Sequence, residues 1–501
     1  MRRGLYSPGG WLLRAAATAL AIGALAGCAA RKTPAATGGA EIPATWSYDR
    51  RATAVNDPWW QRFNGAHPGF ETATEGTPLQ ASSLAQWWNR FGDENLTALV
   101  QRALESNADI RSARAAVRES RARRAQADAA RWPTLDANLA AQRGRTDSRP
   151  AVNSFENSHD GAFDVDLAGV KRRAADAAAA DLLASSAQLA DVQVAVAAEV
   201  ATVYLQLRGD QVRLAIAQRN LQTQRDTLQL ALWRQQAGLA AATEVDQARA
   251  AAEQTAAQVP ALQRSLTRAL TSLARLSGQT PQTIWLAGAP TQPQPDEALT
   301  LALPAQTLRQ RPDVRQAEHR VQAALARLAQ SEAARYPSLS LSGSIGLRAA
   351  TLSGLTGGGT VSSSLVAGLT APLFDGGARR AQVELRDAQV EQARAGFDDA
   401  VLVALKEVED ALMSIASARA RRASLTLAAE AAGRAADLAR QRYVAGLVDF
   451  QTVLDTQRTR LDAEDALAGA QTDVGTAHVA LYQALGGGWE PEPSAAPTGG
   501  S

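Results

Sequence analysis

The chain has 501 residues, of which 46% are hydrophobic and 20% charged, and its formal net charge is +2. This length and composition are typical of a folded protein with two ordinary domains, and they exclude a disordered chain. The 52 basic residues are balanced by 50 acidic ones interleaved along the chain, so no nucleic-acid partner is predicted.

The first segment is predicted to be an export signal that ends at a lipidated cysteine. Two arginines precede an apolar run over residues 15–26, which is too short to span a bilayer. Residues 25–28 read Leu-Ala-Gly-Cys, which resembles a bacterial lipobox with Cys28 as the acylated residue. The alternative is a chance cysteine in an uncleaved anchor. We expect a signal peptide over 1–27 and an acylated linker over 28–83.

The first half begins with a predicted helix and two predicted strands. Residues 96–131 contain no proline or glycine and predict one helix that ends before Pro133. Apolar and polar residues then alternate around residues 135–142 and 163–167, which predicts a pair of strands.

A very long helix is predicted over residues 170–236, which at 1.5 Å per residue spans roughly 100 Å. Leucine or valine recurs every seven residues from Val200 to Leu228, which indicates a coiled coil. Gly238 permits a tight turn, and the predicted return helix over residues 243–276 is about half as long. The first helix completes the length if the two short helices stack end to end beside the long one.

The second half repeats this order after a connector rich in proline and glycine. Its predicted elements are a helix at 312–335, strands at 339–347 and 365–373, a long helix at 378–443 and a return helix at 450–485. Five matching segments in the same order show that the chain is internally duplicated. We assign repeat 1 to residues 84–290, repeat 2 to 291–488 and a disordered tail to 489–501.

The four predicted strands are each about ten residues long with one apolar face, which is typical of a membrane barrel wall. An ordinary soluble hairpin has the same pattern, but the predicted export and lipid anchor favour the barrel. Unpaired strand edges are not tolerated in lipid, and the smallest known barrels have about eight strands. We therefore expect several copies of the chain to complete one pore above a shared helical tube.

Several motifs along the chain resemble those of a known family. They are Trp87, Trp88, Phe91 and Asp93, the Arg-Pro-Asp-Val run at 311–314, the Tyr-Pro-Ser-Leu run at 336–339, the Phe-Asp-Gly-Gly run at 374–377, and residues 443–447 with 453–458. Through them, residues 84–488 resemble the TolC-like outer-membrane efflux proteins. The resemblance is specifically to the NodT or OprM-type lipoproteins, which work with resistance-nodulation-division pumps.

The resemblance implies a mainly α fold with a membrane β part. In it, a homotrimer forms a twelve-stranded transmembrane barrel above a long coiled-coil α-barrel. It also implies a lipid-anchored exit duct in the outer membrane that extends into the periplasm and passes drugs and other small molecules. The implied partners are outer-membrane lipid, a periplasmic adaptor of the membrane fusion type and an inner-membrane resistance-nodulation-division transporter, with no cofactor.

The resemblance also places a gate near the second distal turn. Tyr443 and Asp455 match the gate tyrosine and aspartate of the family, but Val448 stands where the family has an arginine. We expect Asp455 and Asp449 to form an acidic ring that favours cations, with Tyr443 bracing it. The alternative is that these residues only form solvated turns and helix caps.

The two distal turns are the candidate adaptor contacts implied by the resemblance. The residues concerned are Gly238 and Leu239 in the first turn and Gly446 and Leu447 in the second. The alternative is that they only shape the hairpins.

No catalytic or metal site is predicted. The four histidines are scattered without metal-ligand spacing, and the chain has no nucleophile elbow, phosphate-binding loop or dinucleotide motif. We therefore expect no enzyme. Two other functional classes stay open: an exit duct for protein or polysaccharide secretion, and a coiled-coil lipoprotein without transport activity.

Overall fold

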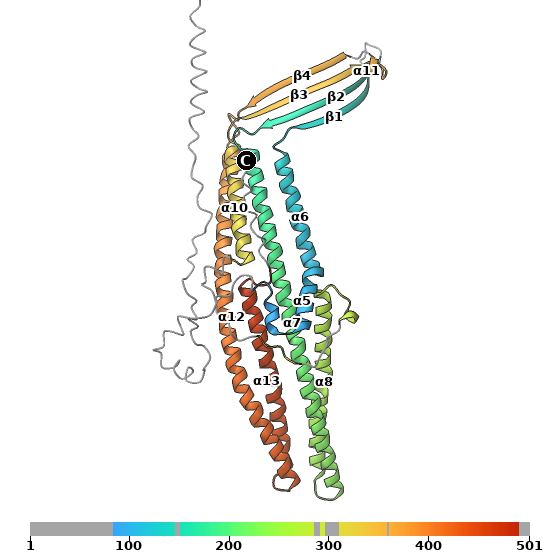
Figure 1. The fold of residues 1–501 in the computed structure, drawn as a ribbon, viewed down its shortest axis with the longest axis vertical. Helices are drawn as coiled ribbons and strands as arrows, with labels where there is room; N and C mark the ends of the chain where they lie inside the picture. The colour runs from blue at the N-terminus through green and yellow to red at the C-terminus, as the bar shows by residue number, and fades with distance from the viewer. Residues whose placement is uncertain (1–83, 146–150, 285–290, 296–309, 358–359, 490–501) are drawn as a thin grey trace, which may run out of the picture. The chain divides into compact units, whose positions relative to one another are not determined.

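The computed structural model describes residues 84–145, 151–284, 291–295, 310–357 and 360–489 (Figure 1). The predicted signal peptide, Cys28, the linker and most of the predicted tail lie outside the described residues.

The order of short helix, two strands, long helix and return helix occurs twice along the described chain, with additional short helices in each half. The first series is η1 (Trp87–Phe91), α5 (Glu94–Ser106), α6 (Ala108–Ala129), β1 (Thr134–Gly144), β2 (Val152–Val165), α7 (Val170–Gln236), α8 (Ala242–Leu276) and η2 (Pro281–Thr283). The second is α10 (Pro312–Ala333), β3 (Ser338–Ala349), α11 (Gly354–Gly357), β4 (Thr360–Thr370), α12 (Ala378–Val444) and α13 (Phe450–Ala484).

The two long helices agree with the prediction from the sequence. Both α7 and α12 have 67 residues, and each is followed by a 35-residue return helix. Part of α7 is apolar enough to cross a membrane by length and composition, but half of that window is buried against other parts of the chain. The apolar stripe of α7 therefore serves helix packing.

The prediction of one helix over residues 96–131 is wrong, because the chain breaks at Asn107. This residue has an extended backbone (ψ 139°), and its side-chain oxygen accepts hydrogen bonds from the backbone N–H groups of Asp109 and Ile110. Asparagine is a strong N-cap, so it ends α5 and begins α6 without any proline or glycine.

The short helices meet end to end at equivalent joints in the two halves. Asn107 donates its amide N–H to the carbonyl of Leu276, the last residue of α8, at 2.9 Å. Arg311 donates to the carbonyl of Ala484, the last residue of α13, at 2.7 Å. Each joint satisfies a carbonyl that a helix end leaves unpaired. The expected stacking of short helices beside the long ones is therefore present, with α6 and α8 along α7 and with α10 and α13 along α12.

The four strands form one antiparallel sheet in the order β1-β2-β3-β4 (Figure 1). The strands are longer than predicted, and the largest differences are in β2 and β4, which begin at Val152 and Thr360 rather than at residues 163 and 365. Both strands also end before the predicted residues 167 and 373. β2 ends at Val165, because the Asp166 carboxylate accepts hydrogen bonds from the backbone N–H groups of Lys171 and Arg172 and so begins α7. β4 ends at Thr370, and Pro372, which lacks a backbone N–H, follows it. The outer strands β1 and β4 each have one unpaired edge within the described chain.

The main core lies where η1 packs between α7 and the end of α13. Trp87 is fully buried, and its ring stacks on Tyr482 with a centroid distance of 5.1 Å. The Tyr204 hydroxyl in α7 donates to the Asp93 carboxylate at 2.7 Å. These contacts tie the start of the described chain to its last helix.

Gly209 marks a close approach of α7 to α13, and we predict that Gly209→Ala destabilises the protein. A Cβ atom at residue 209 would overlap the hydroxyl of Thr472, which donates to the Ala468 carbonyl. Overpacking of this kind typically costs about 1–3 kcal/mol. Thermal melting of the purified protein measures the loss, and the double variant Gly209→Ala/Thr472→Ala is expected to regain part of it.

The matched control for this prediction is Gly396→Ala in α12. Nothing lies within 4 Å of a Cβ at residue 396, so the alanine should leave the melting temperature unchanged or raise it slightly. Equal melting temperatures for Gly209→Ala and Gly396→Ala would contradict the proposed close approach.

Candidate channel gate and hairpin tips

The two helical hairpins end in turns of identical geometry. Gly238 and Gly446 have φ values of 72° and 75°, a left-handed conformation that glycine adopts without strain. Leu239 donates its backbone N–H to the Arg234 carbonyl, and Leu447 donates to the Arg442 carbonyl, at 2.7 and 2.8 Å. Each helix thus ends in a Schellman motif that satisfies its last carbonyls.

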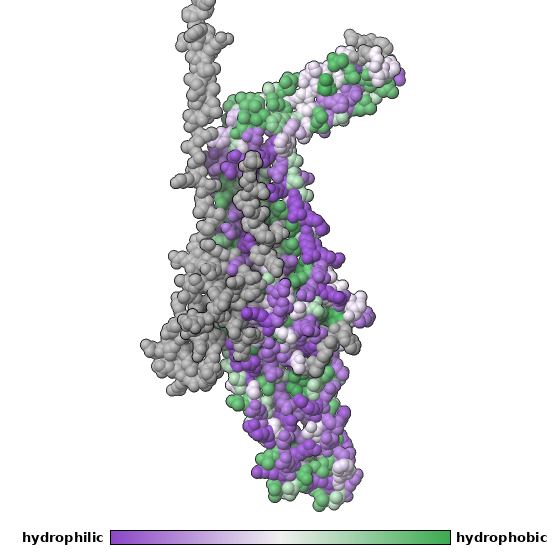
Figure 2. Space-filling model, in the orientation of Figure 1, coloured by the Kyte–Doolittle hydropathy of each residue, from purple (hydrophilic) through white to green (hydrophobic). Residues whose placement is uncertain are grey.

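Both turns present apolar side chains to the surface of the described chain. Leu239 is 70% exposed and Leu447 is 73% exposed. Trp233 in α7 and Val444 in α12 are also exposed close to the turns. Figure 2 shows hydrophobic residues gathered at this end of the molecule.

Tyr443, in the last turn of α12, joins the two hairpins. Its side chain is buried, and its hydroxyl donates to the Glu244 carboxylate in α8 at 3.0 Å. The guanidinium carbon of Arg234 in α7 lies 4.6 Å from the centroid of its ring. Tyr443 therefore contacts both helices of the first hairpin from its place in the second.

An apolar cluster formed by all four helices surrounds this contact. Its buried members are Ala231, Val245, Ala248, Tyr443, Phe450 and Val453, and Leu228, Leu230, Leu232, Val448 and Leu454 pack against them. The cluster packs around the Tyr443 ring and buries it, and the apolar surroundings strengthen the hydrogen bond of its hydroxyl.

Burial raises the pKa of Tyr443, the hydrogen bond with Glu244 raises it further, and Arg234 lowers it. The ordinary pKa of tyrosine is about 10, so the phenol stays protonated at neutral pH and remains a donor. Deprotonation of Tyr443 therefore does not break its hydrogen bond with Glu244 near neutral pH.

Asp449 and Asp455 lie apart from this contact. Asp449 is the N-cap of α13 and accepts a hydrogen bond from the Thr452 backbone N–H at 2.9 Å, and its hydrogen bonds with Thr452 hold its pKa below the usual value. Asp455 is exposed and accepts from the Gln451 side chain. Within the described chain no hydrogen bond joins Tyr443 to either aspartate, and Glu244 takes that place.

The residues that the sequence analysis missed are Glu244 and Arg234. Glu244 lies in the first turn of α8, where acidic residues are common in any helix, and Arg234 lies in the last turn of α7, where basic residues are common. Neither residue could therefore be recognised from the sequence as part of a functional contact.

The sheet has one apolar and one polar face. Leu365 is 84% exposed and lies opposite Gly343, while Asp136 lies opposite Asp160 on the other face. The mainly apolar face carries Leu135, Leu139, Phe163, Leu339, Leu341, Ile345, Leu365 and Leu369, together with Asn157, His159 and Ser363. The mainly polar face carries Asp136, Asn138, Asp160, Ser340, Ser342, Ser344, Ser362 and Ser364, together with Val366.

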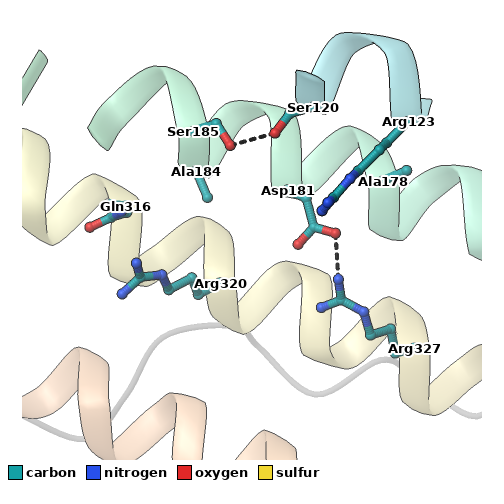
Figure 3. A pocket seen from close by; sticks show the side chains of 9 residues that line it. All are labelled: Ser120, Arg123, Ala178, Asp181, Ala184, Ser185, Gln316, Arg320 and Arg327. Atoms are coloured by element: carbon teal, nitrogen blue, oxygen red, sulfur yellow. Dashed lines mark hydrogen bonds and ion pairs between the residues drawn. The ribbon is translucent and has the colours of Figure 1, made fainter. Parts of the chain in front are cut away.

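An open cavity of about 280 Å³ lies between α6, α7 and α10 (Figure 3). The Asp181 carboxylate pairs with Arg327 across it, and the hydroxyls of Ser120 and Ser185 are hydrogen-bonded at 2.7 Å. The ion pair joins α7 to α10, so these charged side chains hold the helices together. Among the described residues, no group of three or more His, Cys, Asp or Glu side chains is placed to hold a metal ion.

The sheet and the helical hairpins lie in segments that match a known protein family. The family described as outer membrane efflux protein matches residues 99–279 and 303–487. The chain is 33% identical to the pyoverdine export outer membrane protein OpmQ of Pseudomonas aeruginosa, over 82% of this chain and 89% of OpmQ. It is 30% identical to the outer membrane protein OprJ of the same organism, over 89% of this chain and 92% of OprJ.

The fold is shared with solved outer-membrane channels. The outer-membrane channel OprN superimposes with a TM-score of 0.77 at 34% sequence identity, over 85% of this chain and 98% of OprN. The match in sequence covers both halves, and the match in structure covers the helices and the sheet together. The chain therefore belongs to the outer membrane efflux protein family and is located in the outer membrane.

Proposed function

We propose that the protein is the passive exit duct of a tripartite efflux pump and passes drugs and other small molecules across the outer membrane. The observation that carries the proposal is the sheet, which has one apolar and one polar face and continues at its base into helices of 67 residues. The apolar face is suited to lipid and the polar face to a water-filled lumen. Relatives named for pyoverdine export and toluene efflux support a small-molecule cargo.

The duct requires more than one copy of the chain. The free edges of β1 and β4 leave backbone N–H and C=O groups unpaired, which lipid does not tolerate. Pairing β4 of one copy with β1 of the next removes both edges. Three copies of four strands give twelve strands, the number that the sequence resemblance implies, so we propose a homotrimer with a continuous α-barrel below it. Acylation of Cys28 would anchor each copy to the membrane.

The contact between Tyr443 and Glu244 is proposed as the latch of the duct. It holds the two hairpins of one chain together at the end that faces away from the sheet. Opening would move the hairpins apart and break this hydrogen bond. In the trimer, the exposed carboxylates of Asp449 and Asp455 would line the constriction and favour cations.

The exposed turns are proposed as the contacts for a periplasmic adaptor. Leu239 and Leu447 present isolated apolar side chains at the ends of both hairpins, where an adaptor that joins the duct to an inner-membrane transporter would bind. Adaptor binding there would act on the latch, which lies within a few helical turns of both leucines.

Conductance in planar bilayers tests the proposed function, and we expect Tyr443→Phe to open the duct. The phenylalanine keeps the packing and removes only the hydrogen bond to Glu244. A hydrogen bond to a charged group contributes about 1.5–3 kcal/mol, so the ratio of open to closed channels should rise at least roughly tenfold.

Glu244→Gln is expected to open the channel by a smaller amount, and Val444→Ala, at an exposed neighbour, should conduct like the unmodified protein. If neither the unmodified protein nor Tyr443→Phe conducts, the protein is not a duct. If both conduct equally, the latch assignment fails. Drug susceptibility of a deletion strain, complemented with each variant, then separates small-molecule efflux from a secretion duct.

A further inference from the structure

Arg234 contacts the proposed latch from a place that the family pattern does not predict. In the second hairpin, Val448 stands at the position for which the sequence resemblance implies an arginine. The structure instead brings a guanidinium to Tyr443 from the first hairpin, in the last turn of α7.

Arg234 makes two different contacts with the same residue. Its guanidinium lies over the Tyr443 ring at 4.6 Å, and its Nη1 donates to the Tyr443 backbone carbonyl at 3.3 Å. That carbonyl is in the last turn of α12, where helix geometry leaves it without an intrahelical partner, and it otherwise accepts only the Gly446 N–H. A planar guanidinium can stack and donate at once, which the ammonium of lysine cannot do.

The position of Arg234 has a cost that its contacts must offset. Its Nε atom is buried without a hydrogen-bond partner among the described residues. A buried, unpaired donor is unfavourable, and the contacts with Tyr443 offset part of that cost. The order of contacts runs from Arg234 in α7 to Tyr443 in α12 and then to Glu244 in α8.

We propose that Arg234 is a positioning residue of the latch: it fixes the Tyr443 ring so that the hydroxyl meets Glu244. The proposal rests on the proposed function. In this proposal, Tyr443 holds the two hairpins together through three contacts: its ring and its backbone carbonyl with Arg234, and its hydroxyl with Glu244. Opening of the duct must therefore also separate Arg234 from the Tyr443 ring.

The test is the open fraction in planar bilayers of Arg234→Ala and Arg234→Lys. A cation–π contact contributes about 0.5–2 kcal/mol, so Arg234→Ala should raise the ratio of open to closed channels roughly two- to thirtyfold. Arg234→Lys keeps the charge but should behave more like Arg234→Ala than like the unmodified protein. Arg225→Ala, at an exposed arginine earlier in α7, is the matched control and should have no effect.

A double variant distinguishes positioning from general packing. If Arg234 acts through Tyr443, the variant Arg234→Ala/Tyr443→Leu should be no more open than Tyr443→Leu alone, because the ring it orients is gone. Independent, multiplying effects of the two substitutions would overturn the proposal. So would equal behaviour of Arg234→Ala and Arg225→Ala while Tyr443→Phe opens the channel, a result that leaves the proposed function intact. Absence of conductance in all variants would instead reject the proposed function.

Discussion

Leu365→Arg is expected to abolish assembly of the protein in the outer membrane. Leu365 is 84% exposed on the apolar face of β4, where lipid would surround it. An arginine on the lipid face of a barrel costs about 2–4 kcal/mol at the bilayer midplane, and each copy of the chain would bear this cost. Fractionated membranes probed for the oligomer in non-denaturing gels measure the effect, and little or no oligomer should remain.

Ser362→Arg is the matched control for Leu365→Arg. Ser362 lies in the same strand but on the polar face, opposite Gly346. An arginine there faces the proposed water-filled lumen, so the oligomer should form at nearly its normal level. If both variants assemble equally well, the assignment of the two faces to lipid and water is wrong.

Trp87→Ala is expected to produce the largest loss of stability among single substitutions in the helical part. The indole is fully buried and stacks on Tyr482, and Gly487 packs directly against its ring. Truncation of a buried tryptophan typically costs about 3–5 kcal/mol per chain. The melting temperature in detergent, followed by far-UV circular dichroism, should fall by several degrees or more.

Trp233→Ala removes a side chain of the same size from an exposed position and should leave the melting temperature nearly unchanged. Equal losses for the two tryptophan variants would show that the region around Trp87 is not the core that holds the start of the described chain to α13.

Local sequence signals were sufficient for most of the elements. The stretch after Gly169 predicted α7, because its 67 residues contain no proline and are helix-compatible with the single exception of Gly209. The dipeptide Gly-Leu predicted both distal turns, since a left-handed residue after a helix is nearly always glycine. Alternation with a period of two predicted all four strands and their apolar face, although not their ends.

Positions at which a tertiary partner decides the local structure were not predictable. Asn107 caps α6 locally, and its amide N–H also donates to the end of α8, 169 residues away in the sequence, a contact that no local pattern shows. The same applies to the pairing of Tyr443 with Glu244, which are 199 residues apart.

The sequence by itself therefore determined the order of the helices and strands, their amphipathic faces and the length of the two long helices, because these depend on the periodicity and propensity of adjacent residues. Only the tertiary structure decided which carboxylate binds Tyr443 and which arginine covers its ring. Those choices depend on how two hairpins are rotated and placed against each other, and that arrangement is the sum of many small packing contacts along four helices.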